Sequence, residues 1–317
     1  MDHLQSVIHE TPLTTSTFIN EQTRKSVYFK MENQQKTGAF KIRGASYKIS
    51  QLTKQQLQNG VITASAGNHA QGVALAAAKR GGAATIYMPE RTPEAKVSAT
   101  KAYGATIVKT GGSFQEAYEA ARAEQATTNK MFIHPFDDID VMAGQGTIAI
   151  EMLEQNPNLQ TILVPIGGGG LISGIAFAAK WRKPSIQIIG VQAERASATY
   201  NRFYGINQKS LQQVDTIADG IAVKQPGIAT FPYIQRYVDT IITVTETDIA
   251  NAMLYMLERH KSLVEGAGAT ALAGLLAHHR HINTHNIGIV ISGGNMDVSK
   301  LPMIQQLKEQ PKIIQYA

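Results

Sequence analysis

Lys41 is the residue whose setting first suggests chemistry. It stands between Phe40 and Ile42 in a largely apolar stretch, whereas most lysines lie in solvent. Burial disfavours the charged form of an amine and lowers its pKa, so that a neutral nitrogen becomes available near neutral pH. An amine of this kind can form a Schiff base with a carbonyl compound. The sequence therefore makes Lys41 a candidate for covalent catalysis.

Four consecutive glycines, Gly167 to Gly170, lie between an apolar run at Thr161–Ile166 and a helical pattern. Such a run is costly in chain entropy and lets a backbone approach a ligand closely. The usual ligand of a glycine-rich turn from strand to helix is a phosphate. No Gly-Lys-Ser/Thr follows, which excludes a P-loop, and the next strand ends in Gln192 rather than the acidic residue that binds a ribose. The run predicts a phosphate site, with a plain tight turn as the alternative.

Two further segments also follow predicted strands. Ser65–Gly72 opens a helical pattern, where backbone N–H groups could bind a carboxylate or a phosphate. The same residues could equally serve only as a helix cap, since Ser and Asn are preferred there. Ser292–Asn295 reads by itself as a turn.

The elements that must position these segments alternate along the chain. Short β-branched runs predict strands at Val61–Ser65, Ala84–Met88, Ala105–Lys109, Thr161–Ile166, Gln187–Gln192, Thr240–Val244 and Ile287–Ser292. Helical apolar spacing predicts helices at Asn68–Arg80, Pro93–Tyr103, Phe114–Gln125, Gly170–Arg182, Asp248–Lys261 and Gly266–His278. This alternation predicts an α/β protein with open, mostly parallel sheets and helices on both faces. Ligands of such sheets bind at the carboxyl ends of the strands.

Taken together, these segments resemble the fold type II pyridoxal-phosphate enzymes, in the threonine dehydratase (threonine ammonia-lyase) and serine racemase family. The match runs in order along nearly the whole chain. Its motifs are Glu10–Leu13, Lys41–Ala45, Ser65–Gly72, Ala143–Thr147, Gly167–Gly170, Ile217–Gly220, Thr243–Glu246 and Ser292–Asn295.

The resemblance implies a role for each matching position. Lys41 would carry pyridoxal 5'-phosphate as a Schiff base, and Phe40 would pack against the ring. The phosphate would lie on Gly167, Gly168, Gly169 and Gly170 with the Leu171 amide. Asn68 would bind the ring hydroxyl and Ser292 the pyridine nitrogen. The substrate carboxylate would bind the turn formed by Ser65, Ala66, Gly67, Asn68 and His69. A hydroxyl at the ring nitrogen leaves a weaker electron sink, which favours prompt β-elimination.

The resemblance also implies a two-domain fold of the tryptophan synthase beta type. Residues 1–59 and 138–317 would form a large cofactor-binding domain, and residues 60–137 a small domain that closes over the substrate. The activity would be deamination of L-threonine or L-serine to a 2-oxo acid and ammonia, in a homo-oligomer (dimer or tetramer). Alternatives are an amino-acid racemase or a 3-hydroxyaspartate ammonia-lyase on the same cofactor. A non-catalytic nucleotide- or amino-acid-binding protein is the rival from another class, and Lys41 argues against it.

Two departures from the family pattern sharpen this interpretation. Ala39 stands where the family usually has a serine before Phe-Lys. Ala66 stands where the racemases carry a hydroxyl, which implies the dehydratase branch. Only 25 residues follow Ser292, so we expect no isoleucine-responsive regulatory domain.

Composition limits which other partners the protein could bind. The 317 residues contain no cysteine, which excludes disulfides, thiolate-ligated metals and a thiol nucleophile. The formal charge of +6 is spread along the chain without an aromatic-interleaved basic stripe, so we expect no nucleic-acid partner. The N-terminus lacks a signal pattern and no apolar run approaches the ~20 residues of a membrane span. We expect a soluble, cytoplasmic protein with no membrane partner.

We also expect no metal site. Racemases of the family bind a divalent cation through two acidic residues, and those positions hold Gln192 and Ala198 here; hard cations need anionic oxygen ligands. The histidines at 278, 279, 281 and 285 are interpreted as a solvated helix end rather than as metal ligands. The aspartates at 137, 138 and 140 are interpreted as a helix start rather than a calcium loop.

Overall fold

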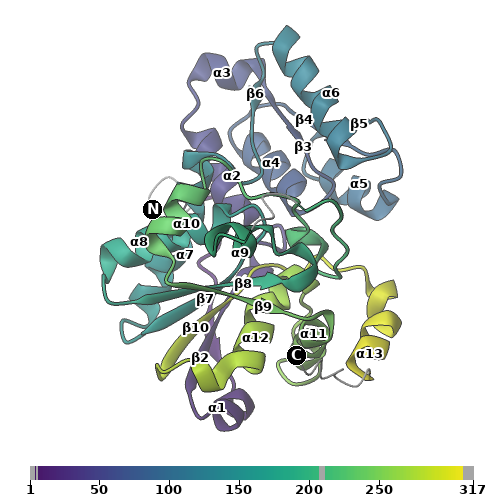
Figure 1. The fold of residues 1–317 in the computed structure, drawn as a ribbon. Helices are drawn as coiled ribbons and strands as arrows, with labels where there is room; N and C mark the ends of the chain where they lie inside the picture. The colour runs from purple at the N-terminus through teal and green to yellow at the C-terminus, as the bar shows by residue number, and fades with distance from the viewer. Residues whose placement is uncertain (1–3, 5, 207–210, 310–317) are drawn as a thin grey trace.

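Two sheets, one above the other in Figure 1, organise the molecule. The computed structural model describes residues 4, 6–206 and 211–309. The large sheet has six strands in the order β1-β2-β10-β7-β8-β9, and the small sheet has four in the order β5-β4-β3-β6. The fold is therefore a two-domain α/β fold, as predicted. The residue boundaries proposed for the two domains stay a prediction.

Almost every strand pair is parallel. The large sheet contains β1 (Leu13–Thr15), β2 (Ser26–Met31), β7 (Thr161–Pro165), β8 (Gln187–Ala193), β9 (Thr240–Val244) and β10 (Asn286–Ile291). The small sheet contains β3 (Val61–Ala64), β4 (Ala84–Met88), β5 (Thr106–Lys109) and β6 (Met131–Phe132). Only the edge pair β1–β2 is antiparallel among the described strands. Central strands such as β7 and β10 are apolar on both faces because helices cover both sides.

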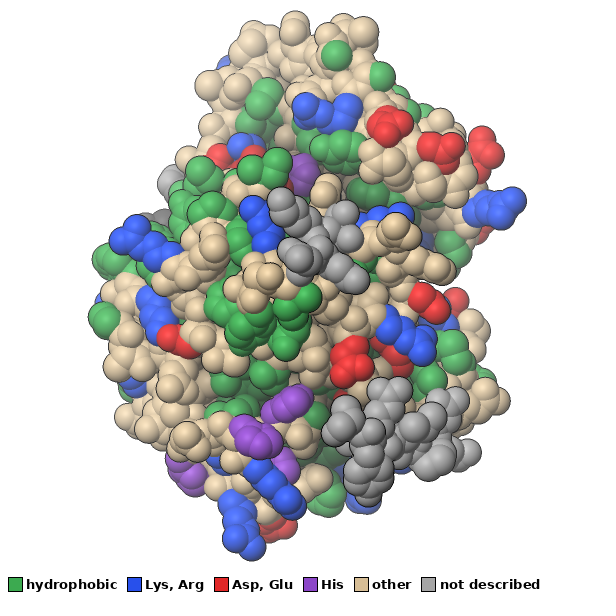
Figure 2. Space-filling view, viewed as in Figure 1, with side chains coloured by type: hydrophobic (Ala, Val, Ile, Leu, Met, Phe, Trp, Pro, Cys, Tyr) green, Lys and Arg blue, Asp and Glu red, His purple; other side chains and the backbone are tan. Residues whose placement is uncertain are grey.

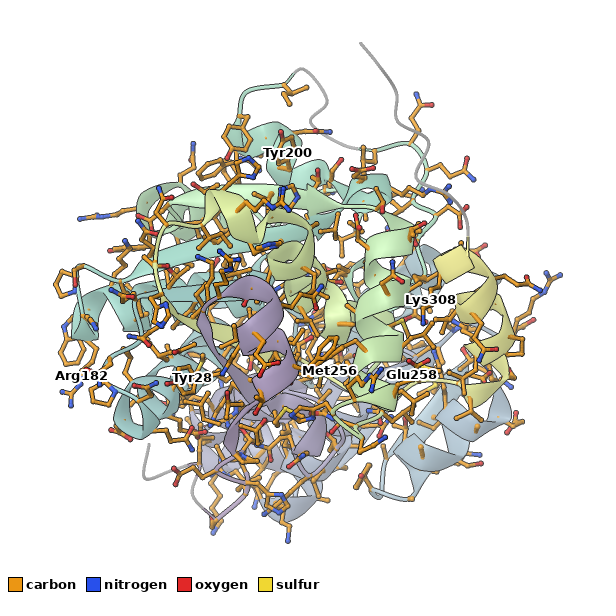
Figure 3. The ribbon with its side chains drawn as sticks, turned by 90° about the horizontal axis from the view of Figure 1, so that it is seen from below. Tyr28, Arg182, Tyr200, Met256, Glu258 and Lys308 are labelled. Atoms are coloured by element: carbon orange, nitrogen blue, oxygen red, sulfur yellow. The ribbon has the colours of Figure 1, made fainter. Side chains whose placement is uncertain are left out.

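Helices cover both faces of the two sheets. They are α1 (Thr17–Thr23), α2 (Lys41–Ser50), α3 (Lys54–Asn59), α4 (Asn68–Lys79), α5 (Glu94–Lys101), α6 (Phe114–Thr127), α7 (Ile139–Gln155), α8 (Gly170–Arg182), α9 (Ala198–Phe203), α10 (Phe231–Tyr237), α11 (Glu246–Glu258), α12 (Gly266–His278) and α13 (Leu301–Glu309). Residues of α11, α12 and α13 form one core against the large sheet, and residues of α7, α8 and α10 form the core on its other face. Figure 3 shows Glu258 of α11 beside Lys308 of α13, with Oε1 and Nζ 3.8 Å apart.

Helix α2 lies where the two sheets meet, packed against α4 on one side and α7 on the other. Glycines make this packing possible. A Cβ at Gly44 would lie 2.7 Å from the Val141 carbonyl oxygen, and one at Gly144 would lie 2.6 Å from that of Arg43. Helices α2 and α7 therefore touch through their backbones at this crossing.

Behind α2, four buried charges form a closed network. The Arg43 guanidinium donates to both carboxylate oxygens of Glu32, at 2.7 and 2.8 Å, and to both of Glu151, at 2.5 and 2.7 Å. The Lys30 ammonium lies 2.6 Å from Glu151. The two positive and two negative groups balance, and they join β2, α2 and α7 at one point. A network in which every charge is paired makes this junction specific.

The predicted strands and helices match the structure closely. The strands at Ala84–Met88 and Thr240–Val244 and the helices at Gly170–Arg182 and Gly266–His278 have the predicted bounds, and the other predicted elements shift by a few residues at their ends. Strands β1, β2 and β6 and several helices, including α2 and α7, were not predicted from the sequence. No helix in the described part of the chain is long and apolar enough to cross a membrane.

Candidate active site

Lys41 is held at the carboxyl end of strand β10. It is the first residue of α2, and the preceding Phe40 N–H donates to the Ser292 carbonyl oxygen at 3.0 Å. Ala39 bridges to Gly293. From the other side, α4 packs so closely that a Cβ at Gly72 would lie 3.1 Å from the Lys41 carbonyl carbon. The sequence segment 39–41 is thus fixed between the two sheets.

The Lys41 amine makes its direct contacts with neutral groups. Its Nζ donates to the Pro135 carbonyl oxygen at 2.7 Å and lies 5.2 Å from the centre of the Phe40 ring. Burial lowers the pKa of this amine to about 8, although the negative charge of Glu265 acts in the opposite direction. A substantial fraction of the amine is therefore neutral close to pH 8.

Glu265 is a site residue that the sequence analysis missed. It is 6% exposed and precedes α12, and its Oε1 accepts from the Asn68 amide nitrogen at 2.7 Å. Burial, followed by the negative charge of Asp219, raises the pKa of this carboxyl to about 7. The signal for it was a charge inside an apolar, alanine- and glycine-rich stretch, which is the same kind of signal that identified Lys41.

Asn68, at the start of α4, has both ends of its amide held. Its nitrogen donates to Glu265, and its oxygen accepts from the Asn295 amide at 2.8 Å. Asn295 in turn donates to the Thr37 carbonyl oxygen at 2.7 Å. The three contacts fix which end of the Asn68 side chain is the donor.

The rest of the predicted substrate turn lies beside Asn68. The Gly67 N–H donates to the Ser65 hydroxyl at 3.3 Å, and Ala66 packs at the edge of the small-sheet core. The buried His69 ring contacts the Ile133 carbonyl oxygen through Nε2 at 2.9 Å. Burial, helped by the nearby charge of Lys41, lowers the pKa of His69 to about 3, so the ring is neutral.

The glycine run forms the turn between β7 and α8. Gly169 has φ of +100°, which favours glycine. A Cβ at Gly168 would lie 2.4 Å from the Phe136 ring. Among the described residues, no acceptor is found for the backbone N–H groups of Gly167 to Leu171. These N–H groups lie at the positive end of the α8 dipole, a ready anion site.

The turn between β6 and α7 joins the two halves of the site. Pro135 accepts from Lys41, and Phe136 packs on the glycine run. Ser292, at the end of β10, is 3% exposed and its hydroxyl points to the Ala267 carbonyl oxygen at 3.4 Å. The predicted residues therefore gather at the carboxyl ends of β3, β7 and β10.

Two groups that the sequence analysis set aside from metal binding have other partners. Asp138 begins α7, accepting from the N–H groups of Asp140 and Val141, as the helix-start interpretation predicts. The His278 and His279 rings contact the carbonyl oxygens of Thr243 and Leu276. Histidine side chains gather in the lower part of Figure 2.

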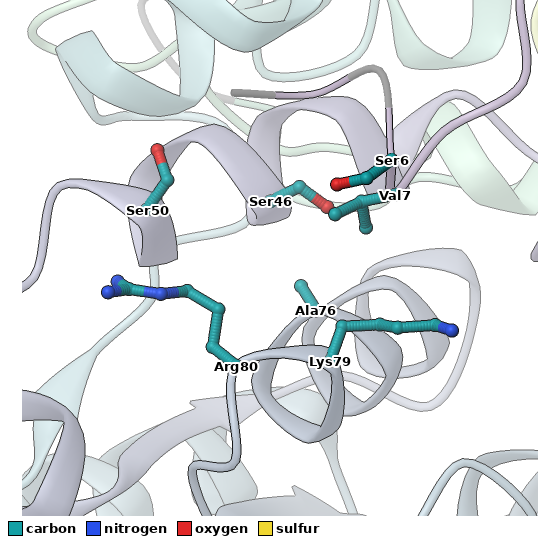
Figure 4. Close-up of a pocket in the computed structure, with 7 residues that line it drawn as sticks. All are labelled: Ser6, Val7, Ser46, Ser50, Ala76, Lys79 and Arg80. Carbon is teal, nitrogen blue, oxygen red and sulfur yellow. The ribbon is translucent and has the colours of Figure 1, made fainter. Parts of the chain in front are cut away.

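A separate cavity lies at the opposite end of α2 from Lys41. It has a volume of about 230 Å³ and is lined by Ser6, Val7, Ser46, Ser50, Ala76, Lys79 and Arg80 (Figure 4). The last turns of α2 and α4 border it, and the Arg80 guanidinium caps α2 by donating to the carbonyl oxygens of Ile49 and Leu52. Its charges thus serve helix ends and stand apart from the Lys41 site.

Comparisons with known proteins agree on the family. The family model described as pyridoxal-phosphate dependent enzyme matches residues 4–293. The chain is 46% identical to an L-threonine ammonia-lyase of Thermotoga maritima over 301 residues, covering 95% of this chain and 75% of that protein. The processed form of threonine deaminase isoform 2 from Solanum lycopersicum superposes with a TM-score of 0.93 at 37% identity, over 96% of this chain and 84% of that one. Maize serine racemase gives a TM-score of 0.90 at 39% identity, over 97% and 95%.

Proposed function

The chain belongs to the family of pyridoxal-phosphate-dependent enzymes, and we propose that it deaminates L-threonine, L-serine or both by β-elimination to a 2-oxo acid and ammonia. The observation that carries the proposal is the half-buried Lys41, whose amine donates to the Pro135 carbonyl oxygen at the carboxyl ends of the strands and has a lowered pKa. The identity of 46% to an L-threonine ammonia-lyase supports the choice of substrate.

The residues present fit the cofactor. Its phosphate, a dianion, matches the N–H groups of Gly167 to Leu171, for which the described residues supply no acceptor. The fixed Asn68 amide nitrogen would donate to the ring hydroxyl, and the Ser292 hydroxyl would meet the ring nitrogen. Lys41 would hold the cofactor through its side-chain nitrogen, beside the Phe40 ring.

When bound, pyridoxal phosphate supplies a conjugated ring that accepts the electrons left when the Cα–H bond breaks. The chain's own part is to position groups and move protons. The turn from Ser65 to His69 would bind the substrate carboxylate at the start of α4. Lys41 would take the Cα proton of the substrate, because its lowered pKa of about 8 makes a neutral amine available near neutral pH.

The remaining steps balance without another reactant. The C–O bond to the β-hydroxyl breaks, and the hydroxyl leaves with one proton as water. The released enamine becomes an imine, and hydrolysis of that imine consumes one water and yields the 2-oxo acid and ammonia. The glycine run would hold the cofactor phosphate, and that group would supply the acid for this protonation.

The test is chemical mapping together with a product assay. We expect yellow holoenzyme, borohydride reduction that fixes the cofactor on Lys41, and equal amounts of 2-oxo acid and ammonia from L-threonine or L-serine. A panel with 3-hydroxyaspartate ranks the substrates. A reduced cofactor on another lysine, or no keto acid from any of the three substrates, would falsify the assignment.

Racemisation is the second candidate function, because the structure resembles maize serine racemase. Forming the opposite enantiomer needs an acid on the far face of the substrate, and Ala66 offers a methyl group there. We therefore expect pyruvate from L-serine without appreciable D-serine. Chiral chromatography decides: D-serine formed as fast as pyruvate contradicts the elimination assignment. The Ala66→Ser variant should increase whatever racemisation exists.

Assembly and location complete the proposal. We infer a cytoplasmic homodimer or homotetramer, on family resemblance. Sedimentation of the holoenzyme measures the assembly, and fractionation of the cells measures the location.

A further inference from the structure

Asp137 is a half-buried acceptor with no role in the proposed chemistry. It lies in the turn between β6 and α7, directly after Phe136. Its Oδ1 accepts from the backbone N–H groups of Ala229 and Thr230 at 2.8 and 3.1 Å, and its Oδ2 accepts from that of Ile228 at 3.0 Å. One carboxylate therefore holds three successive peptide groups of the segment 227–230.

The segment 227–230 in turn holds the glycine run. The Thr230 hydroxyl donates to the Gly168 carbonyl oxygen at 2.8 Å, and the Gly227 N–H donates to the same oxygen at 3.1 Å. The Ser173 hydroxyl of α8 donates to the Thr230 carbonyl oxygen at 3.0 Å. The contact is tight, since a Cβ at Gly169 would lie 2.8 Å from the Thr230 hydroxyl oxygen.

These contacts also fix the orientation of the peptide between Gly168 and Gly169. In a planar trans peptide the carbonyl and the N–H point in opposite directions. The Gly168 carbonyl faces the segment 227–230, so the Gly169 N–H of the same peptide points away from it. Glycine has wide conformational freedom, and without this anchor the peptide could rotate and withdraw its donor.

We propose that Asp137 is a positioning residue for the cofactor phosphate: it fixes the segment 227–230, which fixes the Gly168 peptide with its N–H toward the phosphate. This rests on the proposed placement of the phosphate at the glycine run. The three N–H groups also satisfy the carboxylate, which reduces its repulsion of a nearby dianion. The same turn carries the Pro135 oxygen that accepts from Lys41.

The experiment compares pyridoxal 5'-phosphate with pyridoxal, which lacks the phosphate. Dissociation constants of both are measured on apoenzyme by absorbance and fluorescence titration. We expect Asp137→Asn to weaken binding of the phosphorylated cofactor about tenfold or more, as loss of charged hydrogen bonds does. Binding of pyridoxal should stay within roughly twofold, because it makes no phosphate contact.

Two further variants make the test decisive. Asp138→Asn makes the same charge change one residue later, at a position where asparagine also caps a helix; it should leave the ratio of the two constants unchanged. Thr230→Val removes the hydroxyl that donates to the Gly168 carbonyl oxygen, with little change in shape. It should lower the preference for the phosphorylated form, that is, the dissociation constant of pyridoxal divided by that of pyridoxal 5'-phosphate. Thr230→Ser should restore this preference. If Asp137→Asn does not fold, Thr230→Val decides.

The outcomes separate the two proposals. Wild-type protein that binds both forms equally contradicts the phosphate site, and with it that part of the proposed function. A different result overturns the role of Asp137 alone. In that case the wild-type protein prefers the phosphorylated form, and Asp137→Asn keeps the same preference. If Asp137→Asn does not fold, the same conclusion follows from a Thr230→Val variant that keeps the preference.

Discussion

Two clusters of buried charge lie two residues apart on α2, and they are built in opposite ways. Around Arg43, each carboxylate has a cationic partner within 2.8 Å, and the pKa of the guanidinium is raised because Glu32 and Glu151 outweigh the effect of burial. Around Lys41, the amine donates to a carbonyl oxygen, and Glu265 accepts from an amide. The charged groups around Lys41 therefore hydrogen-bond to neutral dipoles.

The difference shows what pairing does to a buried charge. Paired groups stay ionised and stabilise one arrangement of the chain. Groups that hydrogen-bond to neutral dipoles shift toward their neutral forms when burial outweighs the nearby charges. Burial moves the pKa values of Lys41 and Glu265 toward each other, to about 8 and about 7. Such groups can exchange a proton near neutral pH, which is the property a catalytic site needs.

The largest expected effect is on activity. Lys41→Ala should lower turnover by at least ~1000-fold, because no other amine takes its place. The free energy of unfolding should change by no more than about 1 kcal/mol, since only one neutral partner is lost. Keto-acid assays and urea unfolding measure the two quantities. Lys48→Ala, on the same helix, is the matched control and should keep its activity; a Lys41→Ala enzyme with a tenth of the wild-type rate would break the comparison.

Arg43→Met should have the opposite profile. It leaves two buried carboxylates with Lys30 as their only cation among the described residues, and removal of a buried partner costs about 3–5 kcal/mol. Urea unfolding of the apoprotein measures this loss. Adding Glu32→Gln should recover part of it, because one unpaired charge disappears. Recovery of none would mean that packing of the Arg43 side chain, rather than its charge, stabilises the junction.

Glu265→Gln should remove part of the pH dependence of the protein's stability. The folded protein holds this proton more firmly than an ordinary carboxyl with a pKa of 4.5, so the wild-type apoprotein loses stability as pH rises from about 4.5 through about 7. The difference in free energy of unfolding between the variant and wild type should therefore rise by about 2–3 kcal/mol across that window. Above about pH 7 the difference should stay constant. Unfolding curves at a series of pH values test this, with the exposed Glu258→Gln as control. A difference that is constant from pH 5 to 9 would contradict it.

Lys30→Met should have the smallest effect. Burial lowers the pKa of Lys30 more than its attraction to Glu151 raises it, and Glu151 keeps both hydrogen bonds from Arg43. A loss of about 1–2 kcal/mol is expected from the same urea experiment. A loss as large as that of Arg43→Met would show that the network depends equally on both cations.

Much of the fold could be predicted because its strands and outer helices follow simple periods. The patterns at Ala84–Met88 and Gly170–Arg182 needed no knowledge of the rest of the chain. Helix α2 was not predicted, although Ile42, Ala45 and Ile49 fall on one face of it. The pattern covers only ten residues, and Gly44 within it is a poor helix former.

Residues of the candidate site could be predicted where the residue type is unusual for its local sequence. A lysine among apolar residues and a run of glycines stand out locally. The contact of Glu265 with Asn68 joins residues 197 positions apart, and the hold of Asp137 on the segment 227–230 joins residues about 90 positions apart. Local patterns carry no record of such pairs, so only the folded structure reveals them.

The place of β10 in the large sheet has a consequence for synthesis. This strand, at residues 286–291, lies in the sheet between β2 and β7. When the ribosome has made β1 and β2, the partner strand β10 does not yet exist and follows only after tens of seconds at roughly 5–20 residues per second. During that interval the apolar edge of β2 has no partner strand and is open to wrong pairings. Phe40 also bonds to Ser292, so a nascent chain cannot assemble the lysine pocket until nearly all of it has emerged.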